Sequence, residues 1–253
     1  MAPRVTNTIA TRTRQMPDKT VEYKVGDETV KLSPSIIRNY LVSGNGPVTD
    51  QEIAMFLNLC RYQHLNPFLR EAYLIKYGNQ AATMVVGKDA ILKRAFKNPK
   101  FAGHEAGVIV FIPESGELDY RPGALVLDGE QLVGGWAKVH VKDYSVPVEV
   151  VASFKEYAGK KKNSDGSWSL NSQWASKPAT MIRKVALTQA LREAFPEDLG
   201  GLYGSEEMNV DIDEMALAPV NVEEATVMPE VIEEPQPEPE TQPATMEDIG
   251  SLF

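Results

Sequence analysis

Two segments of this sequence combine positively charged side chains with aromatic rings. The first segment contains Phe68, Arg70, Tyr73, Lys76 and Tyr77. Cationic side chains neutralise phosphates and flat rings stack on unpaired bases, and each stacked base contributes about 1–3 kcal/mol without a sequence preference. Such residues could therefore hold a single nucleic-acid strand. Taken alone, however, this segment is better explained by Phe68 and Tyr73 in a hydrophobic core beside a solvated charged face.

The second segment strengthens the prediction of strand binding, because it combines more of these residues with very few acids. Its members are Lys160, Lys161, Lys162, Trp168, Trp174, Lys177, Arg183, Lys184 and Arg192. The last four cations accompany a predicted helix, where at about 100° per residue Lys177 and Lys184 lie within about 20° of each other. About half of that helix surface could face phosphates, while Ile182 and Val185 would pack on a sheet.

Catalytic and cofactor-binding patterns are absent from the sequence. Residues 86–89 begin to resemble a phosphate-binding loop, but its first glycine would fall at Ala82 and its final Ser or Thr is Asp89. His104 opens a zinc-protease pattern whose second histidine position is Val108. We therefore predict no catalytic residue, no cofactor and no metal ion. Because the acids of the body are scattered rather than paired, a metal-dependent nuclease is only a weak alternative.

Charge is divided sharply along the chain, which carries a net charge of −9 over 253 residues. Residues 1–204 hold all 26 basic residues and 21 acidic ones, whereas residues 205–253 hold 14 acidic residues and no basic one. A basic body with an acidic tail is typical of a polyanion binder whose tail acts separately, although solubility alone could also explain the tail. The Pro- and Glu-rich tail has too few apolar residues to offset the entropy of ordering, so we predict that it is disordered.

The elements that must position these side chains form an α+β pattern, with a small antiparallel sheet flanked by helices. A capping box at Thr49 and Glu52 predicts a helix over residues 50–64, in which Cys60 is a small core residue. The other expected elements are a helix over 36–42, a hairpin of 72–77 and 81–86, a helix over 88–97, three or four antiparallel strands within 101–154, a mobile basic loop over 155–173 and a helix over 178–195.

We expect three parts in the chain. Residues 1–33 are a flexible N-terminal arm, in which the alternating stretch 21–32 also allows a small hairpin. Residues 34–204 form the main domain, and residues 205–253 are the acidic tail. The N-terminus lacks an apolar signal region, and the longest purely apolar run is residues 108–112, so we expect a cytoplasmic protein without a membrane contact.

Several ordered blocks of the sequence are similar to those of a known family. They are LNPFLREAY at 65–73, VVGKD at 85–89, Trp174 with Lys177-Pro178 and MIRK at 181–184, QALREAF at 189–195 and GLYGSEE at 201–207. Together they resemble the RecT/Bet family of phage single-strand annealing proteins, nearest its lambda Red beta branch. The blocks keep their order and spacing over about residues 49–207.

The resemblance implies an ATP-independent protein, not an enzyme, that binds single-stranded DNA and anneals complementary strands in homologous recombination. It also implies a homo-oligomer, as a ring or helical filament, with the strand and the annealed duplex in a basic groove. Two departures stand out. Ala179, Thr180 and Val185 are uncharged where close relatives carry basic residues, and the acidic tail replaces a folded C-terminal domain.

The residues and the resemblance together predict one DNA-binding set. Its members are Arg70, Lys76, Lys142, Lys160, Lys161, Lys162, Trp174, Lys177, Arg183, Lys184 and Arg192, of which Lys142 rests on the resemblance alone. The tail tip, from Ile249 to Phe253, resembles peptides that dock on a host single-strand-binding protein or a replication sliding clamp. The alternative function is a protein that coats single strands, or regulates RNA, without annealing.

Overall fold

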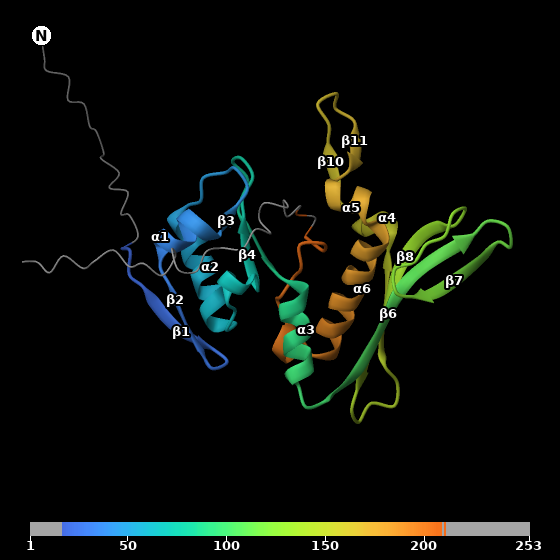
Figure 1. The fold of residues 1–253 in the computed structure, drawn as a ribbon, viewed down its shortest axis with the longest axis horizontal. Helices are drawn as coiled ribbons and strands as arrows, with labels where there is room; N and C mark the ends of the chain where they lie inside the picture. The colour runs from blue at the N-terminus through green and yellow to red at the C-terminus, as the bar shows by residue number, and fades with distance from the viewer. Residues whose placement is uncertain (1–16, 209, 211–253) are drawn as a thin grey trace, which may run out of the picture.

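The computed structural model describes residues 17–208 and residue 210. Residues 1–16 of the expected arm and most of the acidic tail, including the tip from Ile249 to Phe253, lie outside the described residues. Figure 1 shows the N-terminal helices and strands on one side, a larger sheet on the other, and helices α3 (Lys88–Lys97) and α6 (Pro178–Ala194) side by side between them. No helix among the described residues is long and apolar enough to cross a membrane.

The alternating residues near the N-terminus form an antiparallel hairpin of β1 (Val21–Val25) and β2 (Glu28–Leu32). Alternation places Tyr23, Val30 and Leu32 on one face, where all three are buried. The Tyr23 hydroxyl donates a hydrogen bond of 2.8 Å to the carbonyl oxygen of Leu65. Residues 21–32 are therefore a hairpin packed on the main core, which is the second of the two forms that the sequence allowed.

The first helical layer follows the hairpin. Short helical segments α1 (Pro34–Ile36) and η1 (Ile37–Leu41) lead through β3 (Val42–Ser43) to α2 (Asp50–Tyr62). The predicted capping box is confirmed, since the backbone N–H of Glu52 donates to Thr49 Oγ1 and the Glu52 carboxylate accepts from the backbone N–H of Thr49. Cys60 lies in the core, and burial raises the pKa of its thiol to about 12, so it is chemically inert.

A three-stranded sheet packs beside α2. After the short helix η2 (Pro67–Leu69), β4 (Ala72–Ile75) pairs antiparallel with β5 (Thr83–Val86) and parallel with β3. The predicted hairpin is thus confirmed, with shorter strands than expected because Lys76 and Tyr77 already belong to its connection.

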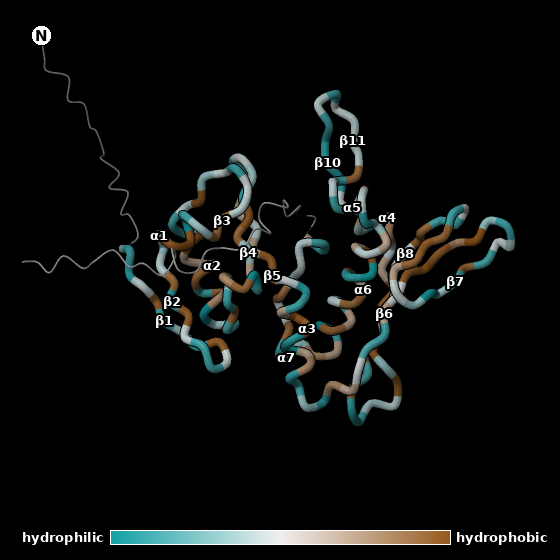
Figure 2. Tube along the Cα trace, in the orientation of Figure 1, coloured by the Kyte–Doolittle hydropathy of each residue, from teal (hydrophilic) through white to brown (hydrophobic). Residues whose placement is uncertain are grey.

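The larger sheet has the strand order β7-β6-β8-β9 and is antiparallel throughout, which confirms the predicted α+β class. Its strands are β6 (Phe101–Ile112), β7 (Glu117–Pro122), β8 (Gln131–Val141) and β9 (Val148–Ser153). Helix α6 covers one face so closely that a Cβ atom at Gly135 would lie 2.5 Å from the carbonyl oxygen of Ile182. Figure 2 shows hydrophobic residues concentrated along the strands of this sheet. The short helix α7 (Pro196–Leu199) follows α6 and contacts α3.

The segment expected to be a mobile basic loop is structured, and that prediction was wrong. It contains α4 (Phe154–Tyr157), a hairpin of β10 (Lys160–Lys162) and β11 (Trp168–Leu170), and α5 (Ser172–Ser176). The turn is closed by Asn163 and Ser167, whose backbone and side chains hydrogen-bond to each other. Strands of three residues carry no apolar period, so the sequence pattern did not reveal them.

A buried ion pair joins α2 to the β4–β5 connection. The ammonium of Lys76 lies 2.8 Å from both carboxylate oxygens of Glu52, and the two side chains are 7% and 15% exposed. Burial alone would raise the pKa of Glu52, but donors from Lys76, Thr49 and Ala82 together outweigh it and lower the pKa to about 2. Lys76 therefore holds two parts of the core together and presents no free charge to DNA, contrary to our expectation.

Replacing Lys76 tests this assignment. Lys76→Met should lower the free energy of unfolding by about 3 kcal/mol, because it leaves the Glu52 carboxylate buried without its partner. The double variant Glu52→Gln/Lys76→Met should recover most of that loss. Urea unfolding measures both, with Arg38→Met as the control, since the exposed Arg38–Asp50 pair should contribute less than about 1 kcal/mol.

The same pair sets a pH dependence. Since the pKa of Glu52 is lowered in the folded protein, its contribution should be complete above the unfolded value and disappear as the pH falls toward 2. If Lys76→Met and Arg38→Met lowered the free energy of unfolding by the same amount, the assignment of Lys76 to a buried ion pair would be contradicted.

Candidate nucleic-acid interface

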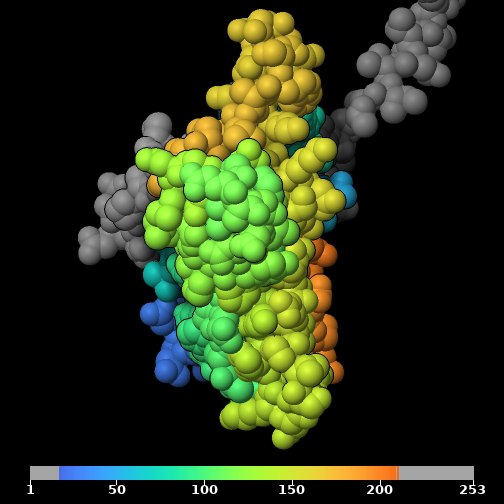
Figure 3. All heavy atoms as spheres, turned by 90° about the vertical axis from the view of Figure 1, so that its right-hand side faces the viewer, coloured from blue at the N-terminus to red at the C-terminus, as the bar shows by residue number. Residues whose placement is uncertain are grey.

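The hairpin β10–β11 projects from the body of the protein, as Figures 1 and 3 show. Lys160, Lys161 and Lys162 are all exposed, and Trp168, which is 66% exposed, stands directly opposite Lys162 in the strand register. Within the described part of the chain, none of the three lysines forms an ion pair. This hairpin, which we name the lysine hairpin, thus combines available positive charge with an accessible aromatic face.

A hollow of about 290 Å³ lies at the foot of the lysine hairpin. Lys160 and Lys161 line one side, and Tyr77 and Thr83, from the β4–β5 hairpin, line another. Lys177 is exposed at the N-cap position of α6 and does not belong to the lining of this hollow. Elements that are far apart in the sequence therefore bring cations and an aromatic ring together around one concave surface.

The remaining cations of α6 are engaged in packing. Lys184 donates to Glu206 at 2.8 Å, and Arg192 donates to Glu207 at 2.7 Å. The guanidinium of Arg192 also lies over the ring of Tyr203, 4.6 Å from its centroid. Residues 203–207, which we name the acidic clip, thus run along α6 and neutralise two cations that we had predicted to bind DNA. In this conformation Lys184 and Arg192 hold the clip, and they offer little free charge.

Trp174 is buried at the base of the lysine hairpin, and Lys142 lies away from it. Trp174 is 1% exposed and meets Phe154 edge to face, with 5.8 Å between the ring centroids. It therefore fills the core and has no face free for a base, which corrects our prediction. Lys142 is exposed, but its ammonium donates to the carbonyl oxygen of Pro99, in the connection between α3 and β6. Figure 1 shows this connection at the opposite end of the molecule from β10–β11.

Arg70 and Arg183 are each partly enclosed. Arg70 has a left-handed backbone with φ of 61°, and both terminal nitrogens of its guanidinium are buried without a hydrogen-bond partner among the described residues. Arg183 donates to the carbonyl oxygen of Ala106 at 3.2 Å. Burial lowers the pKa of His104, and the nearby charges of Arg183 and Lys88 lower it further. Acids also lie nearby, since Asp89 pairs with Lys88 at 3.0 Å.

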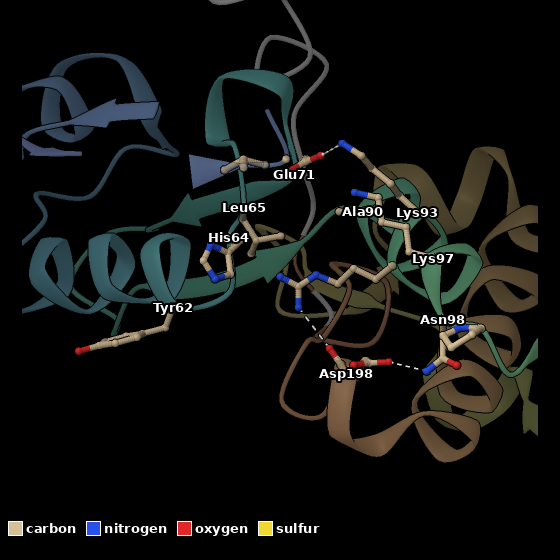
Figure 4. A pocket seen from close by; sticks show the side chains of 13 residues that line it. Tyr62, His64, Leu65, Glu71, Ala90, Lys93, Lys97, Asn98 and Asp198 are labelled. Atoms are coloured by element: carbon tan, nitrogen blue, oxygen red, sulfur yellow. Dashed lines mark hydrogen bonds and ion pairs between the residues drawn. The ribbon is translucent and has the colours of Figure 1, made fainter. Parts of the chain in front are cut away.

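A larger cleft of about 460 Å³ lies between α2, α3 and α7, and Figure 4 shows its lining. Of the three lysine and arginine side chains that line it, Lys93 and Arg94 have partners, whereas Lys97 is exposed. Lys93 pairs with Glu71 at 2.9 Å, and Arg94 donates to Gln63 and to the carbonyl oxygen of Asp198. Because these contacts use most of the positive charge of the cleft, we do not assign strand binding to it.

Trp168 is the functional candidate that the sequence-based site set omitted. The set included only Trp174, which belongs to one of the blocks that carry the family resemblance. A usable signal was present, since Asp165-Gly166 separates the three lysines from Trp168 and such a dipeptide is typical of hairpin turns. A hairpin places Trp168 beside the lysines, as observed.

The two tryptophans should differ sharply in their effect on stability. Trp174→Ala should lower the free energy of unfolding by about 3–5 kcal/mol, because it removes a buried ring from the core. Trp168→Ala should change it by less than about 0.5 kcal/mol, because that ring is largely exposed. Denaturant unfolding of both variants checks the assignment, and a large loss in Trp168→Ala would place that ring in the core instead.

Comparison with known proteins supports the resemblance seen in the sequence. None of the curated proteins compared with the chain matches it. The sequence model of the RecT family matches residues 28–219, which include the lysine hairpin, α6 and the acidic clip. This match covers well over half of the sequence, so the chain belongs to the RecT family.

Proposed function

We propose that this protein binds single-stranded DNA and anneals complementary strands without a nucleotide cofactor, as part of homologous recombination. The observation that carries the proposal is the exposed lysine hairpin, with Trp168 opposite Lys162, in a member of the RecT family. Its three ammonium groups form no ion pair with any described residue and suit phosphates, and its exposed indole suits a base.

The contact set that we propose follows from accessibility. The primary contacts are Lys160, Lys161, Lys162, Trp168 and Lys177, because all five are exposed. Arg70 and Arg183 are secondary contacts in this proposal, because each side chain is only partly exposed. Lys76, Trp174, Lys184 and Arg192 support the fold instead.

The mechanism needs charge and stacking but no reading of base edges. Phosphate contacts fix a strand on the protein, while Watson–Crick pairing with the second strand supplies the specificity. A strand held through its backbone keeps its base edges available. The lysine side chains are long and sit on a paired hairpin, so they can follow a backbone that changes from single-stranded to duplex form.

The proposal includes self-association into a ring or filament, so that successive subunits hold one strand. The sheet face opposite α6 offers apolar surface for such contacts, since Leu118, Tyr120 and Val151 are each about half exposed there. Analytical ultracentrifugation with and without a long oligonucleotide measures this association.

An annealing assay tests the function directly. Two complementary oligonucleotides carrying a fluorophore and a quencher should pair faster in the presence of the protein, without ATP and without shortening of either strand. Binding without acceleration would instead support a strand-coating protein. Stronger binding to RNA than to DNA would favour an RNA-binding regulator, and strand shortening would favour a nuclease.

Neutralising the lysine hairpin tests the proposed contacts. Binding to single strands releases counterions, with a slope of log K against log salt of about −0.7 for each phosphate neutralised. The triple variant Lys160→Gln/Lys161→Gln/Lys162→Gln should therefore bind more weakly and reduce the magnitude of the slope by about 2. Fluorescence anisotropy across a salt series provides the measurement.

A matched variant controls for overall charge. Lys19→Gln/Lys24→Gln/Lys31→Gln removes three other exposed lysines, at the N-terminal end of the described chain, and should leave the slope nearly unchanged. If the two triple variants lost the same affinity, binding would depend on net charge and not on the lysine hairpin.

A further inference from the structure

The described chain ends beside the lysine hairpin. Met208 and Val210 line the same hollow as Lys160 and Lys161, so the last described residues lie at a surface that carries two of the hairpin lysines. The position of this exit follows from the acidic clip, which fixes residues 203–207 along α6. The backbone N–H of Val86 also donates to the carbonyl oxygen of Tyr203 at 2.8 Å.

The sequence beyond this exit is opposite in charge to the lysine hairpin. Residues 211–253 contain 12 acidic residues and no basic one, and Asp211, Asp213 and Glu214 come first. These residues number 43, and a random coil of that length would have a root-mean-square span of about 35 Å, at about 5–6 Å times the square root of its length. Tethering at short range gives carboxylates an effective concentration on the order of millimolar near the lysines.

The acidic clip already shows this pairing at the start of the same segment. Glu206 pairs with Lys184, and Glu207 pairs with Arg192. The first acids after residue 204 thus neutralise nearby cations of α6. The next cations at the exit are Lys160 and Lys161, and they form no ion pair with any described residue. Charge complementarity and position therefore both favour the lysine hairpin as the next partner of the acids.

We propose that residues 211–253, the part of the acidic tail beyond the described residues, dock through their carboxylates on the lysine hairpin and compete there with single-stranded DNA. The competition rests on the proposed function, whereas the docking itself does not. The tail occupies the hairpin lysines of an unbound subunit, and strand phosphates displace it. A long strand that contacts several subunits displaces their tails more readily than a short one, because its phosphates are held locally after the first contact.

Full-length variants of the tail test the competition. In a neutral-tail variant, the 12 acids of residues 211–253 become Asn or Gln, and in a shuffled-tail variant the same residues appear in a different order. The neutral-tail variant should bind a short oligonucleotide about tenfold more tightly at low salt, with a difference below about twofold at 0.5–1 M salt because screening removes the pairing. The shuffled-tail variant should match the natural chain, and a neutral-tail variant of unchanged affinity would overturn the competition.

A second comparison separates docking from general repulsion of DNA by the tail. With Lys160→Gln/Lys161→Gln/Lys162→Gln already present, neutralising the tail should change DNA affinity less than twofold, because the docking partners are gone. A persistent tenfold gain in that background would show that the tail repels DNA without docking, and would overturn the proposal.

Zero-length carbodiimide crosslinking tests docking without reference to DNA function. Mass spectrometry should find tail carboxylates joined preferentially to Lys160–Lys162, and a saturating oligonucleotide should remove those crosslinks. Crosslinks spread evenly over exposed lysines such as Lys19 and Lys97 would overturn the docking. If the natural chain failed to bind or anneal DNA, the proposed function would fail, while the crosslinks formed without DNA would still decide the docking.

Discussion

The packing of α6 is the constraint on which the rest of the structure depends. The helix lies against the four-stranded sheet at Gly135 and also contacts α3, α5 and α7, and most of its residues are buried. A helix enclosed on so many sides has little surface left for solvated charge. Its cations must therefore lie at the edge of the buried face or form ion pairs. Lys184 and Arg192 form ion pairs with the acids of the clip. The position of the clip then determines where the acidic tail leaves the fold.

Local patterns in the sequence predicted the regular elements well. The capping box at Thr49 and Glu52, the alternation in residues 21–32 and the breaks between strands in residues 101–154 each depend on neighbouring residues only, and each has its expected counterpart in the structure. The hairpin β10–β11 escaped prediction because its three-residue strands are too short for a period. Its order comes from a turn closed by Asn163 and Ser167 and from the junction with α5.

The candidate site was harder to predict, because the sequence does not show which lysine and arginine side chains form ion pairs in the folded protein. Lys76 and Lys160 are equivalent as residue types, yet one lies 2.8 Å from Glu52 and the other is exposed on a projecting strand. Glu52 and Lys76 are 24 residues apart, and Lys184 and Glu206 are 22 apart, so no helical or strand spacing connects them. Partners at such separations are set by tertiary packing. The two tryptophans differ for the same reason. Trp168 is exposed, whereas Trp174 is buried by tertiary packing that includes Phe154.

The blocks that carry the family resemblance contribute mainly to this packing. Block 65–73 supplies Glu71, which pairs with Lys93, and block 189–195 supplies Arg192, which pairs with Glu207 of block 201–207. These ion pairs join separate elements of the fold. The blocks that carry the resemblance therefore contain residues that stabilise the fold. The lysine hairpin lies between the blocks, and the strand binding proposed for it needs only positive charge and an exposed ring. A binder that leaves sequence recognition to base pairing can vary such a surface freely, provided that its cations stay unpaired and its scaffold keeps the hairpin projecting.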